Sequence, residues 1–197
     1  IAGIISKMWA ELKDFLSNQK SEPPGLNFSR IALADYAEDQ SIGDVFKAVK
    51  INWPDLPGAK EEIDAVSSIF EKDKFDKYVG ADAAEPLIQE MNKKSVLQNY
   101  KYILFSTHGY LNMSEPALNS IVLSQSNTNS TADGYLTASE VATYNFNNEL
   151  VVLSACDTGV GRLISGEGVT GFPYAFQVAG VKNTIVSLIR SDVRQQP

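Results

Sequence analysis

Leu150-Val151-Val152-Leu153-Ser154-Ala155 is an almost continuous apolar run, and Cys156 follows it directly. A strand inside a parallel sheet is covered on both faces, so its sequence is apolar throughout instead of alternating with polar residues. The run therefore predicts a central parallel strand, with Cys156 at its carboxyl end.

A second apolar run, from Tyr100 to Ser106, predicts another buried strand, which ends at Thr107-His108-Gly109. Apolar residues at helical spacing predict a helix over residues 85–92 and another over 172–179, the latter capped by Gly180. Further short strands are expected over residues 30–36, 75–79, 121–124 and 183–189. Strands and helices alternate, which predicts an α/β fold: a three-layer α/β/α sandwich around a mainly parallel sheet.

Three other segments have local signals. A helix is expected over about residues 59–70, and Ile63, Val66, Ile69 and Phe70 supply its apolar stripe. Thr137-Ala138-Ser139-Glu140 has the spacing of a capping box, which predicts the start of a short helix. Residues 125–134 consist mostly of turn formers and predict a solvated loop.

The length of 197 residues fits one domain with an appendage. Apolar residues recur at helical spacing in the first twenty positions, from Ile5 to Leu16, and Ser21 to Gly25 end the pattern. We therefore expect an N-terminal amphipathic helix and linker over residues 1–22, and a single domain over residues 23–197.

Charge and composition exclude several classes of protein. The net charge is −7, from 17 basic and 24 acidic residues, which opposes direct nucleic-acid binding. No apolar run is long enough to span a bilayer, and a lone cysteine cannot form an internal disulfide. We therefore expect a cytoplasmic protein without a membrane-spanning segment. One cysteine and one histidine also cannot assemble a Cys/His zinc site.

That single histidine and single cysteine each follow a strong predicted strand. Ligands bind outside the carboxyl ends of parallel strands, so His108 and Cys156 are expected to converge there. A thiolate beside an imidazole is the pairing that a cysteine protease uses to attack a carbonyl carbon. The alternative is that Cys156 is a small buried hydrophobe of the core, since cysteine is among the most buried residue types.

Two neighbouring residues have candidate roles of their own. Gly109 has no side chain to block its backbone N–H, which could donate to an oxyanion. Asp157 adjoins the proposed nucleophile and is a candidate substrate-binding residue, although an aspartate at this position also stabilises a turn.

A glycine pattern offers a different function. Gly166-Glu167-Gly168-Val169-Thr170-Gly171 matches the dinucleotide-binding fingerprint, and Asp192 lies at a suitable distance beyond it. That fingerprint must leave a strand directly, whereas the preceding predicted strand ends at Ala155. A nucleotide-binding α/β domain is therefore a less favoured alternative.

The two candidate residues lie in sequence blocks that resemble successive blocks of the CHAT family. The blocks are Phe105-Ser106-Thr107-His108-Gly109, Leu136-Thr137-Ala138-Ser139-Glu140 and Leu150-Val151-Val152-Leu153-Ser154-Ala155-Cys156-Asp157-Thr158-Gly159. Shorter matches occur in the order that the family shows, at Leu56 to Glu62, Gly166 to Val169, Ala175-Phe176, Ala179-Gly180 and Ser187-Leu188. The resemblance covers residues 56–188 and is most specific at the histidine and cysteine blocks.

This resemblance implies a caspase-like fold and a cysteine endopeptidase that cleaves a protein substrate through an acyl-enzyme. By position, Cys156 is the nucleophile and His108 the general base or acid. The backbone N–H groups of Gly109 and Cys156 form the oxyanion hole. No metal or organic cofactor is required.

The resemblance also implies regulation, typical of bacterial defence. Activity would depend on a partner, on processing, or on a TPR-like sensor domain, sometimes beside a CRISPR effector or with a gasdermin as substrate. Compared with the family, the domain is expected to be incomplete at both edges. A catalytically silent scaffold or protein-interaction domain of the same fold stays open as an alternative.

Overall fold

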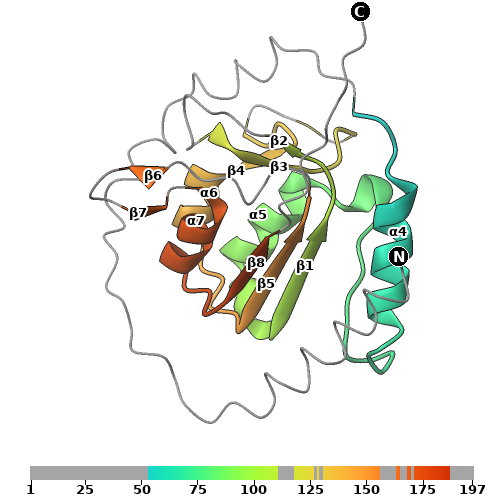
Figure 1. Ribbon diagram of the computed structural model, residues 1–197. Helices are drawn as coiled ribbons and strands as arrows, with labels where there is room; N and C mark the ends of the chain where they lie inside the picture. The colour runs from blue at the N-terminus through green and yellow to red at the C-terminus, as the bar shows by residue number, and fades with distance from the viewer. Residues whose placement is uncertain are drawn as a thin grey trace, which may run out of the picture. The chain divides into compact units, whose positions relative to one another are not determined.

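The computed structural model describes residues 53–110, 118–126, 128, 131–155, 163–164, 168–169 and 171–186. These residues fall into two compact units: Pro54–Val79, and Trp53 together with the residues from Gly80 onward (Figure 1). The helix expected over residues 1–22 and the strand expected over residues 30–36 lie outside the described residues. Each unit is considered separately.

The Pro54–Val79 unit is built on one helix, α4 (Pro57–Ser67), which begins with a proline in its first turn. Proline is favoured there because the first N–H groups of a helix have no partner within it. The predicted helix over residues 59–70 is confirmed, but it begins and ends earlier. Of the predicted apolar stripe only Val66 is buried, and it shares the buried face with Glu62.

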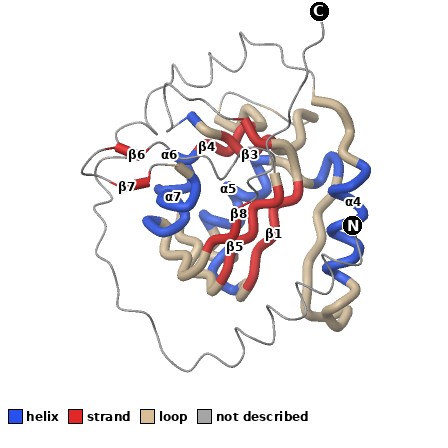
Figure 2. The backbone as a smooth tube through the Cα atoms, in the orientation of Figure 1, coloured by secondary structure: helices blue, strands red, loops and turns tan. Residues whose placement is uncertain are grey.

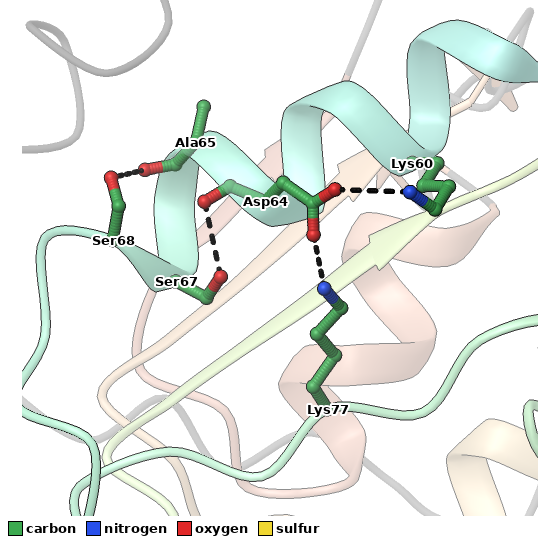
Figure 3. Close-up of polar contacts among 6 residues, drawn as sticks. All are labelled: Lys60, Asp64, Ala65, Ser67, Ser68 and Lys77. Atoms are coloured by element: carbon green, nitrogen blue, oxygen red, sulfur yellow. Dashed lines mark hydrogen bonds and ion pairs between the residues drawn. The ribbon is translucent and has the colours of Figure 1, made fainter.

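Asp64 connects this helix to the chain that follows it (Figure 3). Its carboxylate accepts a hydrogen bond from Lys60 at 3.4 Å, one turn earlier, and another from Lys77. Both lysines lower the pKa of Asp64, Lys77 more than Lys60. The strand predicted over residues 75–79 is wrong: these residues are described as loop, and the Lys77 side chain bonds to the helix.

The larger unit contains a parallel sheet of three strands. They are β1 (Tyr102–Ser106), β5 (Leu150–Ser154) and β8 (Thr184–Val186), in the order β1-β5-β8. β5 lies between its two neighbours and pairs in parallel with both (Figure 2). Leu150 to Leu153 are all buried. The prediction of a central parallel strand is confirmed. Within the described part of the strand expected over residues 183–189, β8 is less buried than predicted, with Ile185 38% exposed.

Three helices share one hydrophobic core with this sheet: α5 (Glu85–Lys93), α6 (Ala138–Thr143) and α7 (Phe172–Val178). The core is rich in phenylalanine. The ring of Phe176 packs edge-on against Phe146 at 5.3 Å and stacks against Phe105 of β1 at 6.2 Å. α7 ends at Val178, one residue before the predicted end, and the predicted glycine follows at Gly180, where a φ of +93° suits glycine.

A second, antiparallel sheet was not predicted. It consists of β2 (Gly109–Tyr110), β3 (Ser120–Val122) and β4 (Tyr135–Thr137), in the order β2-β3-β4. Only β3 was expected, over residues 121–124, because strands of two or three residues give no periodic signal. A third sheet pairs β6 (Leu163–Ile164) with β7 (Gly168–Val169), also antiparallel. The fold is therefore α/β with a parallel sheet of three strands and smaller antiparallel additions.

The predicted capping box is present at the start of α6. The Thr137 hydroxyl accepts a hydrogen bond from the Glu140 backbone N–H at 3.1 Å, and the Glu140 carboxylate accepts one from the Thr137 N–H at 2.8 Å. The preceding loop is less solvated than predicted, because Ala132 and Gly134 are buried.

Glu85, the first residue of α5, is a buried carboxylate with only 1% of its surface exposed. It accepts hydrogen bonds from the Gly134 N–H at 2.7 Å and from Gln89 at 3.0 Å. Burial, together with the nearby Glu140 carboxylate, raises the pKa of Glu85 to about 8.

Within the part of the chain that the structure describes, no helix is long and apolar enough to cross a membrane.

The raised pKa of Glu85 predicts that stability falls as the pH rises. At pH values between the pKa of Glu85 in the unfolded chain, near 4.5, and its pKa in the folded chain, about 8, Glu85 holds a proton when the chain is folded and releases it on unfolding. The free energy of unfolding should therefore decrease by up to a few kcal/mol across this window. Urea denaturation at pH 5, 6.5 and 8 measures the decrease.

Glu85→Gln should remove most of this slope and stabilise the protein at pH 8, because glutamine is neutral at every pH. Glu90→Gln is the matched control, since Glu90 lies on the same helix with an exposed carboxylate paired to Lys94. Parallel pH profiles for the wild type and Glu85→Gln would contradict the prediction.

Candidate active site

His108 lies where the chain leaves one sheet and enters the other. β1 ends at Ser106, and β2 begins at Gly109. The His108 side chain is half-buried. The predicted position of His108, just beyond the carboxyl end of a parallel strand, is therefore confirmed.

Thr107 fixes the backbone at this sheet crossing, which is the connection from Ser106 of β1 to Gly109 of β2. Its N–H donates to the Ser154 carbonyl of β5 at 3.2 Å, and its hydroxyl donates to the Val122 carbonyl of β3 at 2.6 Å. Val122 in turn donates its N–H to the His108 carbonyl at 2.9 Å. The backbone of Thr107 and His108 is thus bonded to strands of both sheets.

The register between β1 and β5 determines where β5 ends relative to β1. Ser106 of β1 lies opposite Ser154 of β5, and Ala155, which follows, is 5% exposed within the core. Cys156 and Asp157 lie outside the described residues. The contact between His108 and Cys156, and the role of Asp157, therefore stay predictions.

Gly109 begins the edge strand β2 and lies opposite Ile121 of β3. The bond from the Val122 N–H to the His108 carbonyl makes Gly109 and Ile121 a non-hydrogen-bonded pair of the antiparallel ladder. In such a pair the N–H groups point away from the partner strand. The Gly109 N–H is thus directed away from β3, on the side of β2 where the described residues form no further strand.

Trp53 contacts His108, and Tyr135 contacts Trp53; neither residue was predicted as part of the site. The ring centroids of Trp53 and His108 are 5.0 Å apart, with the planes tilted by 39°. The Trp53 indole N–H donates to the Tyr135 hydroxyl at 2.9 Å. A tryptophan in an otherwise polar, proline-bearing stretch was the only available signal, and it does not indicate a partner.

Of the glycine pattern, the structure describes Gly168, Val169 and Gly171. Gly168 lies in β7, which pairs antiparallel with β6 in a separate small sheet. A dinucleotide fingerprint instead forms the turn between a parallel strand and the next helix. Among the residues that the structure describes, no group of three or more His, Cys, Asp or Glu side chains could hold a metal ion.

The sequence matches a known protein family. The model of the CHAT domain matches residues 8–194, almost the whole chain. The chain belongs to the CHAT domain family. This family is related to caspase-like peptidases. Searches of curated proteins and of solved structures found no match.

The two-sheet connection in this CHAT domain predicts the effect of Thr107→Val. Valine has the shape of threonine without the hydroxyl, so the bond to the Val122 carbonyl is lost and that carbonyl is left without its partner. The free energy of unfolding should fall by about 1–2 kcal/mol. The NMR signals of the imidazole should also move, and they are easily assigned because His108 is the only histidine.

Thr143→Val is the matched control, because the Thr143 hydroxyl donates to a carbonyl of α6 at 2.7 Å in an exposed position. Water can replace that bond, so the control should change stability little and leave the His108 signals in place. Equal effects of the two substitutions would show that Thr107 does not fix the crossing.

Proposed function

We propose that this chain is a cysteine endopeptidase domain in which His108 and Cys156 form the catalytic dyad. The observation that carries the proposal is the register of the parallel sheet, which sets Ser106 opposite Ser154. His108 lies two residues after Ser106, and Cys156 lies two residues after Ser154. Neighbouring strands lie about 4.8 Å apart, so side chains that leave these two ends can converge. Membership of the CHAT family supports the same function.

The proposed reaction is hydrolysis of a peptide bond through a thioester. The His108 imidazole takes the thiol proton of Cys156, and the thiolate attacks the carbonyl carbon. The C–N bond breaks as the imidazolium gives its proton to the leaving amine. Water then attacks the carbonyl carbon of the thioester while His108 takes a proton from the water. The C–S bond breaks, which releases the carboxylic acid, and His108 returns the proton to the sulfur.

The negative charge that develops on the carbonyl oxygen needs hydrogen-bond donors held in place beforehand. The Gly109 N–H suits this role, because the ladder directs it away from β3 and the crossing at Thr107 fixes its backbone. The backbone N–H of Cys156 is the second proposed donor. In this proposal the chain has a three-layer, caspase-like fold, acts in the cytoplasm on a protein substrate and is regulated by a partner.

A catalytically silent scaffold is the alternative, and the reactivity of the thiol distinguishes the two. Cys156 is the only cysteine, so iodoacetamide reports on this residue alone. An unpaired thiol is only a few per cent thiolate at pH 7, whereas a thiol beside an imidazolium is largely ionised. We expect the folded chain to be alkylated about tenfold faster than the same chain unfolded in urea.

His108→Ala should return the rate of the folded protein to that of the unpaired thiol, while circular dichroism shows that the fold is retained. A wild-type rate no faster than that of the unfolded chain, or a rate unchanged by His108→Ala, would rule out the dyad.

Cleavage of a library of proteins tests the peptidase activity itself. The wild-type chain should produce cleavage products that Cys156→Ala does not, and the sequences at the cleavage sites would define the specificity. A reactive, His108-dependent thiol without cleavage of any library member would favour the silent scaffold.

A further inference from the structure

We propose that Trp53 is a positioning residue that holds the His108 imidazole in the orientation in which it serves Cys156. This role rests on the proposed function. The hydrogen bonds at the sheet crossing fix the backbone of His108, but they leave the two side-chain torsions of the histidine unrestrained. Contacts of the ring must select its orientation. The Trp53 indole provides such a contact, at 5.0 Å between ring centroids.

Trp53 can restrain another ring because both its indole and its backbone are restrained. Its indole N–H donates to the Tyr135 hydroxyl at 2.9 Å, and Tyr135 is 5% exposed in β4. On the backbone side, Pro54 follows and disfavours the helical conformation of Trp53. The indole also packs with Tyr110 against the small apolar cluster of Val122 and Tyr135. Its position is therefore set by the antiparallel sheet.

Filling of the main core does not explain this placement. Among the described residues, the main core cluster is built from buried residues that include members of β3, β4, β5, α5, α6 and α7, and Trp53 packs instead against the small cluster of Val122 and Tyr135. Trp53 is half-buried and contacts the half-buried His108 at the edge of the antiparallel sheet. Replacing it should therefore disturb the imidazole more than it disturbs folding.

The experiment compares Trp53→Ala, Trp53→Phe and Tyr135→Phe in the full chain. Tyr78→Ala is the control, because Tyr78 is an exposed aromatic residue of the Pro54–Val79 unit. Trp53→Ala should slow alkylation of Cys156 by iodoacetamide about tenfold at pH 7, because a misplaced base is a poor partner. Trp53→Phe, which keeps an aromatic face, should recover the rate to within about threefold of the wild type.

Tyr135→Phe should give an intermediate rate, because it keeps the packing of Tyr135 and removes only the acceptor for the indole N–H. The His108 ring signals in NMR provide an independent readout of the contact. They should move toward the values of a solvent-exposed histidine in Trp53→Ala, and stay near the wild-type values in Tyr78→Ala.

The outcomes separate this proposal from the proposed function. If His108→Ala slows alkylation but folded Trp53→Ala does not, the dyad stands and the positioning role of Trp53 is overturned. If neither substitution changes the rate, the dyad fails, and the role of Trp53 fails with it. A slower Trp53→Ala that Trp53→Phe does not rescue, with unmoved His108 signals, would also overturn the proposal.

Discussion

The in-register pairing of β1 with β5 is the constraint on which the rest of the larger unit depends. β5 has a strand on each side, and its residues from Leu150 to Leu153 are buried, so its backbone groups must pair within the sheet. The ladder continues one step beyond β1, from the Thr107 N–H to the Ser154 carbonyl. The carboxyl ends of the two strands are therefore held at the same level.

The antiparallel sheet is attached to this frame at two points far apart in the sequence. Thr107 bonds to Val122 at one end of β3. Just beyond the same end, Ser124 pairs with Ala84, and Glu85 accepts a hydrogen bond from the Gly134 N–H in the segment between β3 and β4. The start of α5 and the end of β1 thus hold the small sheet together. Glu85 is a buried carboxyl group in this link, so its raised pKa predicts that protonation and folding are coupled there.

The fold is predictable from the sequence where the signals are local. The apolar run of β5, the capping box of α6 and the glycine after α7 each specify structure within a few residues. It is not predictable where a strand exists only because of its partner. β2 and β4 are too short to show a period, and residues 75–79 have a strand-like composition but form no strand in the described structure. The position of His108 was predictable for the same reason that β1 was.

The surroundings of His108 could not be predicted, because they are assembled from distant parts of the chain. Trp53 and Tyr135 are separated by 82 positions, and no spacing rule relates them. These contacts connect the half-buried Trp53 with the half-buried His108 and with the buried Tyr135, apart from the fully buried phenylalanines around Phe176. Regions with little apolar burial open locally at a lower free energy than the core. Replacement of Trp53 is therefore expected to disturb the imidazole while the core stays folded.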